Sequence, residues 1–302
     1  MLKDRVDAFL ALRRAMGFEL ETEGYLLHDF ARWAGARGET HVRTQTTMQW
    51  AAAARSPWQR ERRLRTVAVF ARHARVEDPH HEVPPTSVFG FRHRRPTPYI
   101  YSPQEVRRLL DAASRLAPTW PLRPQVFTTL FGLLASTGLR VSEALALRFD
   151  DVTADGLIIR QTKFKKTRLV PLHPSAAAAL DRFLDLRRRV DASSDYLFVS
   201  PNGGRLAYTT IRTWFTRLVR DAGLPSRQMK NPRIHDLRHT FAVRALEASP
   251  DGPSHLGRHV RALSTYLGHV HLADTCWYLH ATPQLMRGVA DACERFLEGD
   301  AP

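Results

Sequence analysis

The chain has little cysteine and no long apolar run. Its two cysteines, Cys276 and Cys293, are too few for a disulfide framework and favour a reducing compartment, so we expect a cytoplasmic protein. No run of about 18 apolar residues is present, which excludes a transmembrane helix. The N-terminal stretch carries acids within its apolar segment and no small-residue cleavage site, so we expect no secretory signal.

Acidic residues and lysine are both in the minority. The chain carries 45 Lys and Arg against 30 Asp and Glu, a net charge of +15 at pH 7, and only five of the basic residues are Lys. Arg binds phosphate bidentately and keeps its proton, so an Arg-rich surface suits a nucleic-acid backbone. Genomic base composition would explain the preference for Arg over Lys but not the excess of bases over acids. We therefore predict a nucleic-acid partner.

Composition and apolar periodicity predict two domains joined by a linker. Residues 1–78 show helical spacing of apolar residues in four segments. Residues 79–98 are proline-rich, basic and without period, which predicts a linker that would let the chain wrap around a duplex. Residues 99–302 combine helical segments with three short strand candidates, at 157–161, 167–172 and 196–199. The pattern favours a mainly α chain with a small antiparallel β-sheet.

Two features mark the ends of the C-terminal part. Ser102-Pro103-Gln104-Glu105 is a capping box with proline at the first helical position, so a helix should begin there. An apolar stripe of helical spacing runs through residues 283–297. This tail could pack on its own domain or dock on a neighbouring protomer. Between these ends we expect further helices at 127–134, 176–190, 209–222, 235–248 and 260–268.

Two motifs place a cation three residues from a second polar group. Arg140 and Glu143 are three apart, which puts them on one face of a helix, and His235 and Arg238 repeat that spacing. Two arginines can neutralise a phosphate whose charge rises at a pentavalent transition state, and a histidine can hydrogen-bond its oxygens. Each motif alone is also typical of a surface ion pair or a solvated helix face.

Three further residues complete the chemistry of phosphoryl transfer. Lys163 lies at the tip of a predicted hairpin, where it can protonate a leaving alkoxide, although Lys165 and Lys166 lie beside it. His269 precedes Tyr278 by nine residues, and a tyrosine hydroxyl can act as a nucleophile. Flanked by apolar residues, Tyr278 would equally suit core packing.

The sequence indicates no metal or cofactor site. His269, His271, Cys276 and His280 could ligate zinc, but no Cys-x-x-Cys pair accompanies them. Carboxylates do not gather in a set that would hold Mg²⁺. We therefore expect chemistry without metal or cofactor.

Four motifs occur in an order and spacing that match a known family. TGLRVSEALAL, TKFKKTRLVPL, HDLRHTFA and LGHVHLADTCWYLH closely resemble the catalytic domain of the tyrosine recombinases, the class of phage integrases, Cre and the Xer recombinases, over about residues 100–285. The segment GFELETEGYLLHDFARW is similar to the helical, SAM-like core-binding domain of that family. Matched position by position, the resemblance implies that Arg140 is the first catalytic arginine and that Glu143 supports it. It implies that Lys163 is the catalytic lysine and that His235 and Arg238 are the His-x-x-Arg pair. It implies that His269 is a further catalytic histidine and that Tyr278 is the nucleophile.

The resemblance implies a site-specific DNA recombinase or integrase. Tyr278 would form a 3′-phosphotyrosyl link and release a 5′-hydroxyl, with neither ATP nor metal. The implied partners are double-stranded DNA with inverted-repeat core sites and further protomers. The protomers would form a homotetramer on two duplexes or assemble with related recombinases. The implied location is the cytoplasm, in association with DNA. A type IB topoisomerase and a non-catalytic accessory DNA-binding protein remain alternatives.

The same resemblance bears on the biological role. The core-binding segment begins near residue 1, so we expect no arm-binding domain before it. That organisation favours a short recombinase of a mobile element, such as a transposon. Chromosome dimer resolution of the Xer type is the alternative role.

Overall fold

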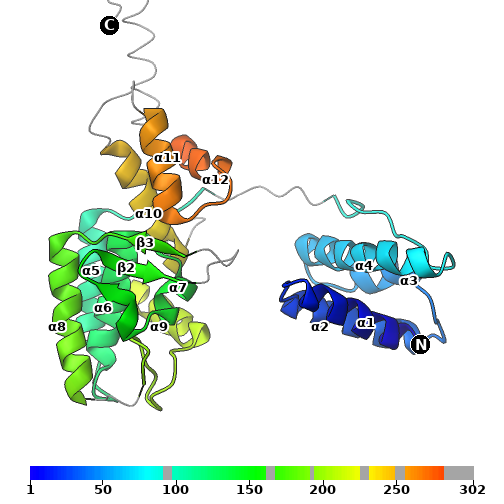
Figure 1. Cartoon of the computed structure of the whole chain (residues 1–302), viewed down its shortest axis with the longest axis horizontal. Helices are drawn as coiled ribbons and strands as arrows, with labels where there is room; N and C mark the ends of the chain where they lie inside the picture. The colour runs from blue at the N-terminus through cyan, green and yellow to red at the C-terminus, as the bar shows by residue number, and fades with distance from the viewer. Residues whose placement is uncertain (91–96, 161–166, 191–193, 225–230, 249–255, 282–302) are drawn as a thin grey trace, which may run out of the picture. The chain divides into compact units, whose positions relative to one another are not determined.

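The chain forms two compact units, Met1–Pro96 and Thr97–Pro302. A computed structural model describes residues 1–90, 97–160, 167–190, 194–224, 231–248 and 256–281. The described residues are mainly helical with one small antiparallel sheet, which confirms the predicted fold class (Figure 1). No helix among them combines the length and the apolar character that crossing a membrane requires.

The N-terminal unit is a packed set of four helices among residues 1–90. Aromatic rings from each helix meet in its core, where Phe9 packs edge-on against Phe70 and Phe30 packs edge-on against Trp50. The last helix begins at a proline, and the hydroxyl of Ser56 caps it by accepting a hydrogen bond from the backbone N–H of Gln59. The four helices are α1 (Leu2–Ala15), α2 (Glu21–Gly35), α3 (Thr44–Ala52) and α4 (Pro57–Glu77).

Part of the predicted linker is bonded to this unit. His81 Nδ1 accepts a hydrogen bond from the backbone N–H of Val42 at 3.0 Å, and the backbone N–H of Ser87 donates to Glu61 Oε1. Composition alone could not show these bonds, because they are made by single buried side chains in a segment without period. Residues 91–96, which hold most of the positive charge of the predicted linker, lie outside the described residues.

The C-terminal unit is built around one central helix, α6 (Arg123–Thr137), which packs against four others. The capping box predicted at the start of this unit is present. Ser102 Oγ accepts a hydrogen bond from the Glu105 N–H, and a Glu105 carboxylate oxygen accepts one from the Ser102 N–H. The remaining helices of the described part are α5 (Pro103–Ser114), α7 (Val141–Ala146), η1 (Phe149–Asp151), α8 (Pro174–Val190), α9 (Tyr208–Asp221), α10 (Ile234–Glu247), α11 (Leu256–Leu267), α12 (Ala273–Cys276) and η3 (Trp277–Ala281).

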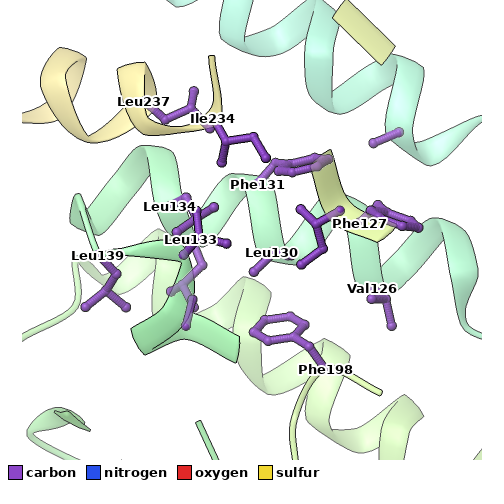
Figure 2. Packing of buried hydrophobic residues seen from close by; sticks show 14 of the residues in the cluster. Val126, Phe127, Leu130, Phe131, Leu133, Leu134, Leu139, Phe198, Ile234 and Leu237 are labelled. Carbon is purple, nitrogen blue, oxygen red and sulfur yellow. The ribbon is translucent and has the colours of Figure 1, made fainter. Parts of the chain in front are cut away.

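The core of this unit lies along α6. Phe131 of α6 points toward Ile234, and Leu130 of α6 points toward Phe198 (Figure 2). Phe131 also packs edge-on against Phe215 of α9 with ring centroids 5.4 Å apart. This buried contact area fixes where α10 begins and therefore where its polar residues lie.

The sheet has three antiparallel strands in the order β1 (Val152–Thr153), β2 (Gly156–Ile159) and β3 (Arg168–Val170). Two of the predicted strands are therefore confirmed as β2 and β3, with bounds that differ from the predicted ones by one or two residues. The third prediction, at 196–199, is wrong, because Tyr196 and Val199 form only isolated bridges, to Arg148 and Arg205. Residues 197–199 are buried, and a short apolar run does not distinguish a strand from other buried backbone.

A second cluster of apolar residues lies at the end of this unit formed by α10, α11, α12 and η3. Leu263 and Leu267 of α11 pack there with Val243 and Leu246 of α10. Figure 1 shows α10, α11 and α12 together beside β3. The helical tail predicted at 283–297 lies outside the described residues.

Candidate active site

Arg140 and Glu143 form the N-terminal cap of α7. Arg140 is the N-cap residue and lies before the helix, so the prediction that both residues occupy one helix face is wrong in its detail. The Glu143 carboxylate accepts hydrogen bonds from the Arg140 backbone N–H at 3.0 Å and from Arg140 Nη1 at 2.7 Å. Arg140 Nη2 donates to the carbonyl oxygen of Gly268 at 3.3 Å. The cap therefore fixes both the backbone and the guanidinium of Arg140.

Glu143 is shared with a second arginine, Arg168 of β3. Arg168 Nη1 and Nη2 donate to the two oxygens of Glu143 at 3.1 and 2.8 Å, and its Nε donates to the Tyr266 carbonyl oxygen. Burial raises the pKa of Glu143, but the bonds from Arg168 and Arg140 outweigh it and hold that pKa below its usual value. Glu143 is thus an anion that joins α7 to the sheet. From the sequence, Arg168 was predicted only as part of the strand at 167–172.

Arg238 is the most buried cation of the site, with 2% of its surface exposed. Its Nη1 donates to the Gly138 carbonyl oxygen at 2.7 Å, and its Nη2 donates to the Leu267 carbonyl oxygen at 2.8 Å and to His269 Nε2 at 2.9 Å. Burial, and then the charge of Arg140, lower its pKa to about 10, so it stays protonated near neutral pH. Two carbonyls and one imidazole therefore hold a buried positive charge in place.

His269 follows α11 and bonds through both ring nitrogens. Because its Nε2 accepts from Arg238, its proton lies on Nδ1, which donates to Thr275 Oγ1 at 2.7 Å. Burial, and then the charges of Arg238 and Arg140, lower the pKa of His269 to about 4. The ring is therefore neutral near pH 7.

His235 faces an open cavity of about 620 Å³ that Arg140, Arg205 and Tyr208 also line. The protein atoms around the ring, and then the charge of Arg238, lower its pKa to about 4, even though part of its surface stays open to solvent through the cavity. A neutral histidine and a partly exposed guanidinium therefore border the same hollow.

Tyr278 lies in η3 with 3% of its surface exposed. Its hydroxyl oxygen is 3.2 Å from His239 Nδ1, and its ring stacks near that of His269 with centroids 6.2 Å apart. Burial raises its pKa, and the charge and hydrogen bond of Arg238 oppose that rise only in part. The hydroxyl is therefore protonated near neutral pH and lies between a cation and an imidazole.

These contacts bring together six of the seven residues that the sequence singled out. Lys163 lies outside the described residues, as do Lys165 and Lys166. Arg168, His239 and Thr275 lie within the four sequence motifs, where His239 directly follows Arg238, but none of them was assigned a role from the sequence. In the structure each of them bonds a predicted site residue. The residues that are brought together are Arg140, Glu143, His235, Arg238, His269 and Tyr278.

The described residues offer one group with the spacing of metal ligands, outside this site. His41, Asp78 and His80 have ligand atoms within 4.8 Å of one another. Asp78 already accepts a hydrogen bond from Arg5 at 3.0 Å, and that guanidinium competes with any cation for the carboxylate. We interpret the group as a set of hydrogen bonds that joins α1 to the end of α4. At the candidate site, the two bonds of His269 leave neither of its ring nitrogens for zinc.

The arrangement defines a site for an anion that carries charge on several oxygens. Arg238 hydrogen-bonds the buried Tyr278 hydroxyl, the neutral His269 packs on the Tyr278 ring, and Arg140 and the neutral His235 line the cavity. Residues 100–284 match the phage integrase family, so the chain belongs to that family. It is a site-specific DNA recombinase of the tyrosine type, as the sequence predicted.

Relatives match along the chain. The putative integrase/recombinase y4rB of Sinorhizobium fredii is 40% identical over 307 residues, which cover 97% of each chain. The tyrosine recombinase XerC of Alcanivorax borkumensis is 31% identical over 234 residues, which cover 76% of this chain and 71% of XerC. Neither the topoisomerase nor the accessory-protein alternative has support from these relatives.

Solved structures share the fold. The Tn1549 transposon integrase in complex with circular intermediate DNA has a TM-score of 0.64 and 19% identity, with 96% of this chain and 98% of that chain covered. A lambda integrase tetramer bound to a Holliday junction has a TM-score of 0.60 and 18% identity, with 89% and 77% covered. At these identities the likeness establishes the fold alone.

Proposed function

We propose that Tyr278 is the nucleophile of the recombinase and that Arg140, His235, Arg238 and His269 stabilise the phosphate under attack. One observation carries this assignment: the buried Tyr278 hydroxyl lies beside Arg238, which the same chain of contacts connects through His269 and Gly268 to Arg140. A tyrosine placed only for packing would gain nothing from a buried guanidinium group that hydrogen-bonds its hydroxyl.

The reaction follows from these positions. The Tyr278 oxygen attacks the scissile phosphorus, the P–O5′ bond breaks, and a 3′-phosphotyrosyl link forms. Arg140 and Arg238 neutralise the charge that grows on the phosphate oxygens, while His235 donates a hydrogen bond from the cavity wall. His269 acts through the Arg238 amino group that it binds. Glu143 positions Arg140, and Lys163 protonates the leaving 5′ oxygen.

The covalent link makes the reaction reversible without ATP or metal. It keeps the energy of the broken phosphodiester, so the 5′-hydroxyl of another strand can attack the phosphotyrosyl bond and rejoin DNA. We place the catalytic lysine at Lys163 and the domain division at residues 1–78, 79–98 and 99–302, with the N-terminal helices as the core-binding domain.

The partners we propose are double-stranded DNA with inverted-repeat core sites and further copies of this chain. The net charge of +15 and the DNA named with the structural neighbours support duplex DNA. The lambda integrase tetramer on a Holliday junction supports a tetramer on two duplexes. We further propose that the chain serves a mobile element, because the 40% identical relative is named an integrase/recombinase and a transposon integrase shares the fold.

Trapping the covalent intermediate tests the function and identifies the DNA. The purified chain is incubated with sheared genomic DNA from its source organism, and the mixture is then denatured. DNA that stays covalently linked to the protein is recovered and sequenced. We expect one recurrent site with inverted repeats, and a peptide that carries a nucleotide on Tyr278. Failure to link any DNA, or a link at random sites, would contradict site-specific recombination.

Strand exchange between two plasmids that carry the recovered site separates recombination from topoisomerase activity. Recombinant products are expected, and their frequency should depend on both copies of the site. Relaxation of supercoiled plasmid without exchange and without a site requirement would instead indicate a type IB topoisomerase.

A further inference from the structure

The proposed reaction requires a group that accepts the proton of the Tyr278 hydroxyl. Burial keeps the pKa of Tyr278 above its usual value, so the hydroxyl must lose a proton as it attacks. With only 3% of its surface exposed, Tyr278 has little access to water that could take this proton. A group of the protein at hydrogen-bond distance is therefore needed as the acceptor.

His239 lies at that distance. Its Nδ1 is 3.2 Å from the Tyr278 hydroxyl oxygen. His239 follows Arg238 directly in α10, so the backbone that holds the buried guanidinium also holds this imidazole. Arg238 and His239 thus approach one hydroxyl from the same helix, the first with its guanidinium and the second with an imidazole nitrogen.

The His239 ring is held by its aromatic neighbours. The His235 ring meets it nearly perpendicularly with centroids 4.6 Å apart, and the Trp277 ring lies 5.3 Å away at 58°. The Tyr278 ring itself is 5.4 Å away at 57°. An imidazole packed on several sides presents its Nδ1 to the hydroxyl without the loss of entropy that a free side chain would incur.

His269, the other histidine packed on the Tyr278 ring, is not available for this role. Its Nε2 accepts from Arg238 and its Nδ1 bonds Thr275, so neither nitrogen can receive a further proton without losing a bond. His239 Nδ1 is by contrast within hydrogen-bond distance of the hydroxyl oxygen itself.

We propose that His239 is the general base that activates Tyr278. As the phenolic oxygen bonds to phosphorus and the P–O5′ bond breaks, the hydroxyl proton moves to His239 Nδ1. The 5′ oxygen takes its proton from the acid assigned to Lys163, so each proton has a donor and an acceptor. In the reverse step the His239 imidazolium returns its proton to Tyr278 as the phosphotyrosyl bond breaks. This inference rests on the proposed role of Tyr278.

Two substitutions separate a base from a group that only orients the hydroxyl. His239→Asn places a carboxamide oxygen near the position of Nδ1, where it accepts the hydrogen bond but has no useful affinity for a proton. His239→Ala removes both functions. His173→Asn is the matched control, because His173 is exposed and its ring bonds Ser175.

The measurement is single-turnover formation of the covalent adduct by the full chain. The substrate is a nicked duplex that carries the site recovered by adduct sequencing, so that cleavage cannot reverse. We expect His239→Asn and His239→Ala both to slow cleavage by about 10²–10⁴-fold, the usual contribution of a general base. DNA affinity and cooperative melting should be retained in His239→Asn, and His173→Asn should match the wild type. A wild-type cleavage rate in His239→Asn would overturn the proposal.

A fluorinated tyrosine at position 278 supplies a second readout that a structural role would not change. Fluorine lowers the pKa of the phenol, which lessens the need for a base. We expect 3-fluorotyrosine at position 278 to recover part of the rate lost in His239→Asn, and no recovery would contradict base catalysis. If the wild-type chain forms no adduct at Tyr278, the proposed function fails; if it does and the variants match it, only the role of His239 fails.

Discussion

Arg168 of β3 and Glu143 of α7 form a bidentate ion pair, with N–O distances of 3.1 and 2.8 Å. Through it the sheet fixes the same carboxylate that orients Arg140. The pair is largely buried, since 11% of the Arg168 side chain and 6% of the Glu143 side chain are exposed. The position of the first proposed catalytic arginine therefore depends on a strand that is not adjacent to it in sequence.

Replacing Arg168 should weaken both the fold and the site. Arg168→Met leaves a buried carboxylate with one cationic partner, and we expect a loss of about 2 kcal/mol in the free energy of unfolding, below the usual cost of a fully unpaired buried charge because Arg140 remains. Adduct formation should fall as well, since Arg140 loses its fixed support. Urea denaturation measures the first effect.

The control for this prediction is Arg244→Met, which removes an ion pair whose arginine side chain is 51% exposed. That substitution should cost less than about 1 kcal/mol. Equal losses in the two variants would show that the Arg168–Glu143 pair has no special structural role.

Gly138 holds the carbonyl that binds Arg238, in a backbone conformation with φ of 62°. A Cβ there would lie 2.5 Å from Phe241 Cδ1, so Gly138→Ala combines a left-handed backbone with a steric clash. Gly223→Ala is the matched control, because Gly223 has φ of 59° with nothing within 4 Å of its Cβ position. We expect about 1 kcal/mol of destabilisation for Gly223→Ala and clearly more for Gly138→Ala, with loss of adduct formation only in the latter. Similar melting temperatures would argue against this packing.

Acid should destabilise the fold through His269. Its folded-state pKa of about 4 lies below the ordinary value of 6.5, so between these pH values the unfolded chain binds more protons than the folded chain. The stability that the neutral ring contributes is complete above about pH 6.5 and is lost as pH falls toward 4. We expect the free energy of unfolding of His269→Gln to change less steeply with pH than that of the wild type in this window, by up to about 1 kcal/mol per pH unit. Parallel curves would mean that His269 titrates normally.

The affinity for duplex DNA should fall steeply with salt. The net charge of +15 lets the chain neutralise several phosphates, and each contact releases counterions into solution. A plot of the logarithm of affinity against that of salt concentration should be linear with a negative slope. An affinity that does not change with salt would show that the positive charge does not contact DNA.

Motifs with a local physical cause were predictable from the sequence. The capping box at Ser102 and Glu105 was predicted because both partners lie within one turn. Arg140 and Glu143 were paired correctly, but spacing alone could not tell a cap from two positions inside a helix. Residues 196–199 were predicted as a strand because an apolar run shows burial without showing backbone pairing.

Residues that act across the fold gave no such signal. Arg168 reaches Glu143 over 25 positions, and His239 reaches Tyr278 over 39, so neither pairing has a local spacing that could reveal it. The resemblance to a family identified the set that includes Arg238 and His269. It did not identify the groups that hold these two residues in place, such as the Gly138 carbonyl at Arg238 and Thr275 at His269.

The central claim is that Tyr278 carries the covalent bond to DNA, and Tyr278→Phe tests it most directly. Removing the hydroxyl keeps the ring and its packing, so the variant should fold, bind the recovered DNA site with near-normal affinity and form no covalent adduct. Tyr266→Phe is the control, since the Tyr266 hydroxyl donates to the Pro171 carbonyl oxygen and plays no part in the proposed reaction; it should still form the adduct. An adduct that persists in Tyr278→Phe, mapped by mass spectrometry to another residue, would contradict the account.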